Sequence, residues 1–570
     1  MAKKLLTLIK RLKYELTYFF KPNIKIDGYQ NLNNFTIQSS MPEDIKKIFW
    51  RNSDNSVFTE LPFIVFGKDL SANIKDSLSS YDDFADYEFN SKNLKPAFFN
   101  KGDVKVPYEK SRFQFLQLLI NPNGMEREIK LPDFDFQNLP KIFWNSPMDV
   151  SIRNINLIFY YLHLPLLIDK NISQGKKVLD SSSKRFIEEP KLLEQIGVES
   201  IQTHYQFIIN NLENKGNVVA NHYLIELASI LLTLANFTFE GKDKHVQHFI
   251  NELDLQISKQ FYKDGTNFEG STHYSAFVTE ALIICKLSIE ELDKNNTLIS
   301  KIDHIIRSNR FFLSLMINNE ELSQIGDNDS GRLFYKFHRE DKPLQIGWLI
   351  ELIDLLYPNT DSEIDTSIRN INYQTNEIFD LDSLKKVSHT EIKVFNDEFT
   401  QFGYQEFGIF IWRNKQEFLS IRCGPIGQNG FGGHAHYDQL SIECFTNNMW
   451  IARDPGTGTY TDDIETRNNF RSLNYHWGPK TKLKFPKEDQ FDCFKLNYVS
   501  DGKALKFDKN NFLGFADFNG KRIYRKITIN NGVVRIEDLS NDVELEKYST
   551  WGEQNNGIKV KFSNGYKRIS

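Results

Sequence analysis

The chain has 570 residues, with 70 basic and 75 acidic side chains and a formal net charge of −5. This near balance gives no electrostatic case for a nucleic-acid-binding protein, so an anionic partner must be met by a local basic or polar patch. The length suits two or more domains with sizeable cores. Four cysteines without a CxxC pair argue against a disulfide framework.

The N-terminal segment "MAKKLLTLIKRLKYELTYFFKP" is basic and amphipathic, with leucines at helical spacing. Lys10, Arg11 and Lys13 interrupt its apolar face, so it lacks the unbroken core of a secretory signal and predicts a cytoplasmic chain. It is too short and too charged to span a bilayer. Two interpretations remain: a helix packed on the body, or peripheral contact with an anionic membrane surface.

Residues 140–380 predict a run of amphipathic helices, because apolar residues recur at i, i+3, i+4 and i+7 in successive segments. Loops of a few to about twenty residues join them, which favours antiparallel helices in a bundle or a ring of hairpins. The clearest segments are "VSIRNINLIFYYLHL", "HYLIELASILLTLANF", "HYSAFVTEALIICKLSIEEL" and "KIDHIIRSNRFFLSLMI".

In the helical region, two segments carry candidate reactive side chains. Asn221 and His222 open the helix "NHYLIELASILLTL", where an asparagine is also an ordinary helix cap. Tyr274 follows the polar loop "GTNFEGST" at the start of the next strong helix. It is either a core tyrosine or a proton donor beside a cleft.

The loop "IGDNDSGRLF" begins like a calcium-binding loop at Asp327 but lacks a closing glutamate, because Arg339 stands at the twelfth position. A tight turn with self-bonded carboxylates is the ordinary interpretation. Arg332 is a candidate for binding a sugar carboxylate or for anchoring the turn.

From about residue 390 the apolar period changes to two, which predicts an antiparallel β-domain, most simply a sandwich. "RIYRKITI" and "VVRIEDL" flank "NNG", a strong hairpin signal. Cys423 and Cys444 fall on the apolar faces of predicted strands and are expected to be buried thiols. We predict an N-terminal extension (1–110), a helical domain (111–385) and a β-sandwich (386–570), with the active cleft between the last two.

The segment "GGHAHYDQL" at residues 432–440 places two of the 12 histidines one residue apart. His436, Asp454 and His476 together form a donor set that zinc accepts, although metal ligation, acid–base chemistry and plain turn structure all remain open. On a regular strand His434 and His436 would point the same way. Because two glycines precede them, we expect a non-strand backbone here.

Taken in order, "NH", "NFEGSTHY", "GGHAHYDQLS", "DPGTGTYT" and "NNFRS" resemble the motifs of the heparinase II/III family of polysaccharide lyases, over roughly residues 140–500. This resemblance implies an incomplete (α/α) toroid followed by an antiparallel β-sandwich. It implies β-elimination on an anionic, uronic-acid-containing polysaccharide. It also implies a cell-envelope or periplasmic location, at odds with the missing signal.

The resemblance further implies roles for individual residues. Asn221 would neutralise the substrate carboxylate with help from His222. Tyr274 would be the acid, or both acid and base, and His434 would be the base or a charge stabiliser. A structural zinc would be bound by His436, Asp454 and His476, although "NYHWGP" departs from the family pattern around the last of these. Substrate contacts would come from Arg332, Tyr460 and Arg471.

Two other classes of function remain open on this sequence. One is a non-catalytic glycan-binding or surface-polysaccharide assembly protein that kept the fold. The other is a zinc hydrolase, in which His436 and Asp454 would hold a metal that activates water. The sequence specifies neither the polysaccharide nor an oligomeric state.

Overall fold

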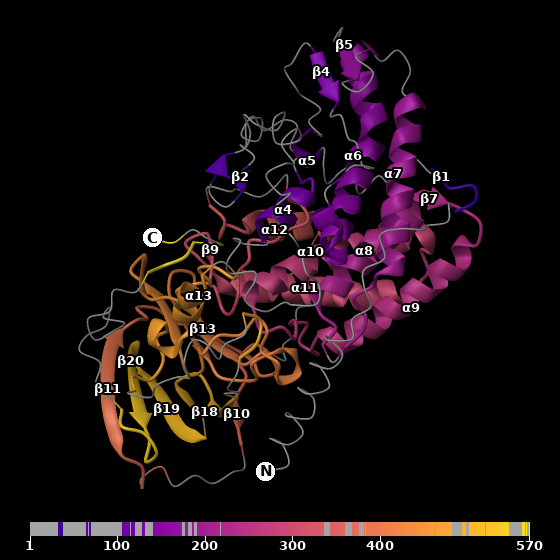
Figure 1. Cartoon of the computed structure of the whole chain (residues 1–570). Coiled ribbons are helices and arrows are strands. Elements are labelled where there is room, and N and C mark those ends of the chain that lie inside the picture. Colours follow the sequence, from indigo (N-terminus) through magenta and orange to yellow (C-terminus); the bar gives the residue numbers. More distant parts are fainter. Residues whose placement is uncertain are drawn as a thin grey trace.

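The computed structural model shows a helical part followed by a β-rich part (Figure 1). The residues that the structure describes are 32–37, 64–65, 68–69, 105–114, 116–119, 128–131, 139, 141–173, 177–180, 185–186, 191–216, 218–335, 342–358, 368–375, 381, 383–461, 463–481, 493–496, 501–518, 520–545, 561–564, 566 and 569. The basic N-terminal segment lies outside them, so its predicted contact with a membrane stays a prediction, as do the three domain boundaries. Among the described helices, none is long and apolar enough to cross a bilayer.

The helical part is a succession of helices packed on one another. Helix α8 packs against α6 and α10 as well as against α7 and α9, the pattern of a layered helical ring. The helices are α4 (Lys105–Ser111), α5 (Leu116–Leu119), α6 (Pro147–Ser173), α7 (Lys191–Asn210), α8 (Asn221–Asn236), α9 (Lys242–Gln260), α10 (Thr272–Leu292), α11 (Leu298–Met316) and α12 (Gly347–Leu356).

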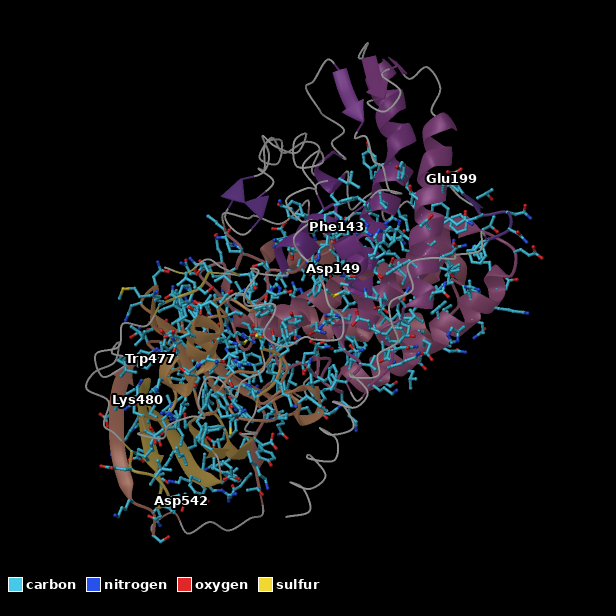
Figure 2. The ribbon with its side chains drawn as sticks, viewed as in Figure 1. Phe143, Asp149, Glu199, Trp477, Lys480 and Asp542 are labelled. Atoms are coloured by element: carbon cyan, nitrogen blue, oxygen red, sulfur yellow. The ribbon has the colours of Figure 1, made fainter. Side chains whose placement is uncertain are left out.

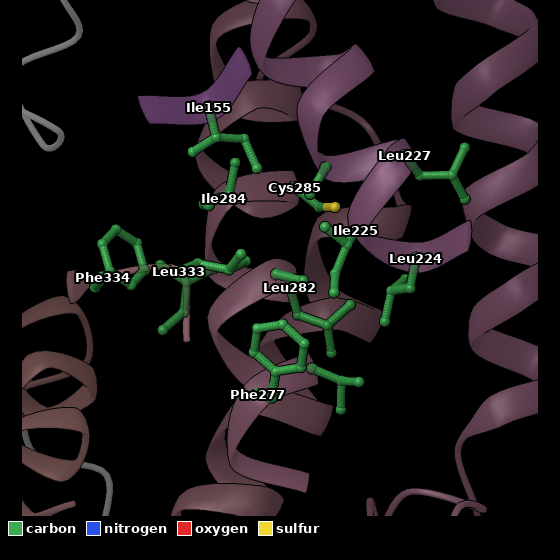
Figure 3. Packing of buried hydrophobic residues seen from close by; sticks show 14 of the residues in the cluster. Ile155, Leu224, Ile225, Leu227, Phe277, Leu282, Ile284, Cys285, Leu333 and Phe334 are labelled. Atoms are coloured by element: carbon green, nitrogen blue, oxygen red, sulfur yellow. The ribbon is translucent and has the colours of Figure 1, made fainter. Parts of the chain in front are cut away.

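Helices α8 and α10 form the centre of this core because they are apolar on nearly all sides. In α8 every residue except His222 is buried. Figure 3 shows Leu224 and Ile225 of α8 beside Leu282 and Cys285 of α10. By contrast, α9 and α11 each bury only one face, as amphipathic helices on the outside of a helical domain do.

The C-terminal part is a sandwich of two antiparallel sheets, in the strand orders β10-β17-β18-β19-β20-β11 and β12-β13-β14-β15-β16. Phe410 and Trp412 from one sheet meet Phe507 and Phe512 from the other in a single apolar cluster. The strands are β10 (Tyr373–Gln374), β11 (Lys386–Lys393), β12 (Thr400–Tyr404), β13 (Ile409–Arg413), β14 (Phe418–Arg422), β15 (Ile442–Thr446), β16 (Met449–Ala452), β17 (Gly502–Phe507), β18 (Asn511–Phe518), β19 (Lys521–Asn530) and β20 (Val533–Leu539).

The predicted fold class, an incomplete (α/α) toroid followed by an antiparallel β-sandwich, is confirmed. The predicted "NNG" hairpin joins β19 to β20, with Asn530 opposite Val533. Cys423 and Cys444 are buried thiols outside any disulfide, as predicted. Short strands accompany the helical part. Three pairs are β1 (Thr36–Ile37) with β7 (Phe237–Thr238), β2 (Ile64–Val65) with β3 (Lys68–Asp69), and β8 (Ile317–Asn318) with β9 (Glu321–Leu322), and a three-stranded sheet has the order β4 (Glu128–Leu131), β5 (Lys177–Asp180), β6 (Arg185–Phe186).

The two parts meet through loops whose backbones bond to one another. The Gln428 N–H donates to the Phe268 carbonyl at 2.7 Å, and the Asp327 N–H donates to the His434 carbonyl at 2.9 Å. Gly427 has φ +82°, and a Cβ there would lie 2.6 Å from the carbonyl oxygen of Glu269. Only glycine allows this close approach. Side chains occupy the region between Asp149 in the helical part and Trp477 in the sandwich (Figure 2).

Glu280 of α10 fixes the loop that follows Asp329, because its Oε2 accepts from the Leu333 and Phe334 N–H groups, each at 2.7 Å. Burial raises the pKa of Glu280 to about 7, although these two hydrogen bonds act to lower it. Its contribution to stability is therefore full below its unfolded pKa of 4.5 and is lost as the pH rises through about 7.

Replacing Glu280 by glutamine should remove this pH dependence, because the amide oxygen still accepts both hydrogen bonds and never ionises. We compare the free energy of unfolding of Glu280→Gln with that of wild type. The difference, variant minus wild type, should be roughly 2–3 kcal/mol larger at about pH 8 than at about pH 5, so the variant gains relative stability as the pH rises. Urea unfolding of both proteins at the two pH values measures it. An equal difference at both values would show that folding does not raise the pKa of Glu280.

Candidate active site

Tyr274 stands at the first turn of α10, where Ser271 caps the helix by accepting the Tyr274 N–H on its Oγ at 3.1 Å. The tyrosine ring stacks on the His434 imidazole with 3.8 Å between the ring centroids and 24° between the planes. Its hydroxyl lies 3.4 Å from the hydroxyl of Tyr460. The sequence allowed two interpretations of Tyr274, a core tyrosine or a proton donor. In the structure its side chain is buried, and it also packs on a predicted catalytic histidine.

Burial, reinforced by the charges of Asp329 and Asp327, raises the pKa of Tyr274 well above its usual value of 10.0. The hydroxyl therefore keeps its proton at neutral pH. A protonated phenol has a proton that it can donate to a leaving oxygen.

Asn221 lies at the start of α8 but does not cap it, because the N-cap is Ala220. Instead, the Asn221 side-chain amide donates to both carboxylate oxygens of Glu269, at 3.0 and 2.8 Å, and its backbone N–H donates to Oε1 at 2.8 Å. Its own Oδ1 is buried and has no hydrogen-bond partner among the residues that the structure describes. The side chain is therefore held with its donors on a carboxylate rather than used as a helix cap.

His222 does not join this cluster, although it is the next residue. Its side chain is 46% exposed, and Nδ1 lies 2.9 Å from Glu213 Oε2. Successive residues of a helix point about 100° apart, so a buried Asn221 turns His222 towards solvent. The structure therefore brings together Asn221, Tyr274 and His434, and leaves His222 outside.

The two histidines of the H-x-H loop separate as expected, because the regular strand β15 begins only at Ile442. His434 lies between two carboxylates, with Nδ1 3.2 Å from Asp327 Oδ2 and Nε2 3.3 Å from Glu269 Oε2. His436 presents Nε2 to the other Asp327 oxygen at 2.9 Å and Nδ1 to His476 Nε2 at 3.4 Å. One ring faces Tyr274 and the other faces the predicted metal ligands.

Asp327 is the carboxylate that these two histidines share, and Arg467 of α13 (Ile464–Arg471) binds it from the opposite side. The Arg467 Nη1 donates to Oδ1, and Nη2 donates to Oδ2 at 2.7 Å. Burial opposes the ionised form, but the charge of Arg467 and the hydrogen bonds from the histidines hold the pKa of Asp327 well below its usual range. The sequence interpretation of this residue as a self-bonded turn carboxylate is wrong.

Asp329 is a second buried carboxylate near Tyr274. Lys105 of α4 donates to its Oδ2 at 2.9 Å, and His273 Nε2 lies 3.2 Å from its Oδ1. These partners hold the pKa of Asp329 well below its usual range, against the effect of burial. Asp329 also accepts the Gly331 N–H at 2.7 Å, so here the predicted turn bonding is present.

The predicted metal set is assembled: the ligand atoms of His436, Asp454 and His476 lie within 4.8 Å of one another, and all three residues are buried. Asp454 also accepts the Gly456 N–H at 2.9 Å, so the Asp-Pro-Gly turn holds it as expected. His476 Nδ1 lies 2.7 Å from the Ser472 carbonyl oxygen, which only accepts. In the neutral ring, Nε2 then carries the lone pair, 3.3 Å from Asp454 Oδ2, and the donor set fits a zinc ion.

The three residues predicted to contact substrate lie in different surroundings. Tyr460 belongs to the cluster, with its hydroxyl near Tyr274 and its ring 4.8 Å from the Arg467 guanidinium. Arg471 is buried and donates to the carbonyl oxygens of Cys493 and Lys495 and to Asn468 Oδ1, and burial lowers its pKa to about 10. The Arg332 guanidinium lies 5.4 Å from the centroid of the Tyr335 ring.

Glu269, Asp327 and Arg467 are the members of the cluster that sequence reasoning missed. All three lie within segments already singled out: "NFEGSTHY", "IGDNDSGRLF" and "NNFRS" together with the residues just before it. The sequence offered one signal for such residues: a charged residue in a glycine-containing loop, close in sequence to a candidate catalytic group. That signal is weak, because solvated turns carry the same residues.

Residues 399–476 match the family model described as Heparinase II/III-like, C-terminal. The chain carries a heparinase II/III-like C-terminal domain. The matched residues include β12 to β16, the H-x-H loop, the metal set and α13. The heparinase II/III-like domain thus contributes His434, Tyr460 and Arg467 to the cluster, and the helical part contributes Asn221, Glu269, Tyr274 and Asp327.

The chain is also similar to two solved structures of polysaccharide lyases. The heparan sulfate lyase HepC from Pedobacter heparinus is 13% identical, with a TM-score of 0.41, over 85% of this chain and 73% of that chain. Heparinase III is 13% identical, with a TM-score of 0.48, over 94% of this chain and 77% of that chain. No curated protein matches the sequence.

Proposed function

We propose that this protein is a polysaccharide lyase that cleaves a uronic-acid-containing polysaccharide by β-elimination. The observation that carries the proposal is the stacking of Tyr274 on His434, beside the Asn221–Glu269 pair, where the helical part meets the heparinase II/III-like domain. These side chains come from three separate segments and supply a neutral amide, a protonated hydroxyl and an imidazole. β-Elimination on a uronate requires such groups.

The substrate carboxylate must be met by hydrogen-bond donors, because charge moves onto it when the C5 proton leaves. Asn221 Nδ2 and His434 Nε2 both face the Glu269 carboxylate in this structure. A carboxylate is thus already bound at this place by the Asn221 amide, beside the His434 imidazole. A uronate carboxylate that enters beside Asn221 would take hydrogen bonds from this amide, with Glu269 moving aside or sharing the donors.

The elimination then needs one base and one acid. In the proposed sequence the base takes the C5 proton, the electron pair forms the C4–C5 double bond, and the C4–O bond breaks. The acid protonates the departing glycosidic oxygen, and no water is consumed. His434 and Tyr274 fill these roles because their rings are in contact and the Tyr274 hydroxyl is held in its protonated form.

We propose zinc as the ion for His436, Asp454 and His476. Bound there, zinc would supply a rigid cross-link between the H-x-H loop and the segments that carry the other two ligands. His436 is two residues from His434, so this cross-link would fix the backbone of the catalytic histidine.

The test is to incubate the zinc-loaded protein with a panel of uronic polysaccharides and to record ultraviolet absorbance from the C4–C5 unsaturated uronate. We expect a rise in absorbance with at least one member of the panel. New reducing ends without this absorbance would instead establish a hydrolase. Binding to a polysaccharide without new ends would establish a glycan-binding protein and contradict the lyase assignment.

A further inference from the structure

We infer that Asp327 is a positioning residue that sets the ring orientations of both H-x-H histidines, aiming His434 at the proton-transfer site and His436 at the metal. This inference rests on the proposed lyase function for the role of His434. Asp327 belongs to the helical part, whereas both histidines belong to the heparinase II/III-like domain. One carboxylate would thus connect the two predicted sites across the junction of the two parts.

Asp327 is held in a buried network of hydrogen bonds and ion pairs. Its Oδ2 lies 3.2 Å from His434 Nδ1 and its Oδ1 lies 2.9 Å from His436 Nε2. The side chains of Asp327, His436 and Arg467 are fully buried. The Asp327 N–H also donates to the carbonyl of His434 at 2.9 Å, so side chain and backbone bind the same loop.

The hydrogen-bonding roles at Asp327 follow from Arg467, which binds both carboxylate oxygens. A carboxylate paired in this way with a guanidinium is ionised, and an ionised carboxylate only accepts. The ring nitrogens that face Asp327 must therefore carry hydrogens: Nδ1 on His434 and Nε2 on His436. Asp327 thus determines which nitrogen of each ring is left for chemistry.

The two histidines present opposite nitrogens to the same carboxylate, and this separates their functions. His434 is left with Nε2, which lies 3.3 Å from Glu269 Oε2 at the place proposed for the substrate carboxylate. His436 is left with Nδ1, which lies 3.4 Å from His476 Nε2 in the metal set. A histidine binds a metal through its unprotonated nitrogen while a carboxylate holds its other N–H.

The experiment compares Asp327→Asn with Asp538→Asn in the full chain. Asp538 is a matched control, because it is buried in the sandwich and binds Arg525 through both oxygens, at 2.7 and 2.8 Å. Asp327→Asn should weaken zinc affinity, measured by competition with a chelator, by about 10–100-fold. It should lower kcat by a similar factor with little change in KM, measured on the best polysaccharide of the panel.

Loss of a buried ion pair alone would lower the thermal stability of both variants and leave zinc affinity and kcat the same in both. That outcome would overturn the inference. If Asp327→Asn does not fold, wild-type protein with 15N-labelled histidine decides instead. His434 must then be the Nδ1–H tautomer and His436 the Nε2–H tautomer in the metal-free protein, and the reverse assignment of either ring would refute the role of Asp327.

Zinc affinity and ring tautomers do not depend on catalysis. Failure of wild type to form unsaturated product would therefore defeat the proposed function, whereas unchanged zinc affinity in Asp327→Asn would defeat this inference.

Discussion

Tyr274→Phe is expected to lower the rate of unsaturated-product formation by about 10²–10⁴-fold, the usual contribution of one general acid or base. The change removes a single hydroxyl, which lies 3.4 Å from the Tyr460 hydroxyl, and keeps the ring that stacks on His434. Binding of the polysaccharide should persist, because the aromatic surface is unchanged. Initial rates and equilibrium binding, measured on the same preparation, separate the two effects.

Tyr223→Phe is the matched control for this prediction. Tyr223 is equally buried in the helical part, and its hydroxyl donates to Glu252 Oε2 at 3.0 Å, outside the cluster. The Tyr223→Phe variant should be somewhat less stable than wild type and should form unsaturated product at the wild-type rate. Full activity in Tyr274→Phe would show that another group donates the proton, and equal losses in both variants would point to a general effect of removing a buried hydroxyl.

Asn221→Ala should lower kcat by about 10²–10³-fold, because it removes the neutral donor that the proposed mechanism places at the substrate carboxylate. It also deprives Glu269 of two side-chain hydrogen bonds while leaving that carboxylate buried. An unsatisfied buried group costs roughly 1–3 kcal/mol, so the thermal midpoint should fall as well. Steady-state rates and thermal unfolding measure the two effects.

The same substitution at the next residue, His222→Ala, is the control. His222 is half-exposed and bonded to Glu213, so the change should alter stability by no more than about 0.5 kcal/mol and leave the rate near that of wild type. A loss of activity in His222→Ala equal to that in Asn221→Ala would restore His222 to the catalytic set. A fully active Asn221→Ala would remove the amide from the mechanism.

The fold was predictable because apolar residues recur at helical spacing in the first part of the chain and at every second residue in the β-rich part. Helices α8 and α10 bury apolar residues on nearly every side, so no arrangement other than the centre of a helical layer suits them. The "NNG" turn fixed the β19–β20 hairpin, since its residues accept positive φ. The two glycines before His434 correctly predicted that the H-x-H loop precedes the strand.

The partners of the candidate residues were not predictable in the same way. Arg467 and Arg471 are one turn apart on α13, and the sequence did not show which of them faces the cluster. In the structure Arg467 binds Asp327, whereas Arg471 binds the carbonyls of Cys493 and Lys495. Both arginines lie on the buried face of α13, so burial alone does not distinguish them.

By itself, the sequence determined the order of helical and β parts and the buried thiols, and it supplied the candidates for the reactive groups, because periodicity and local motifs extend over only a few residues. Only the tertiary structure decided which charges surround those groups. Asp327 meets His434 across 107 residues and Arg467 across 140. Contacts at such separations depend on how loops of the two parts pack, and an isolated Asp-Asn-Asp turn looks the same whether it faces water or two histidines.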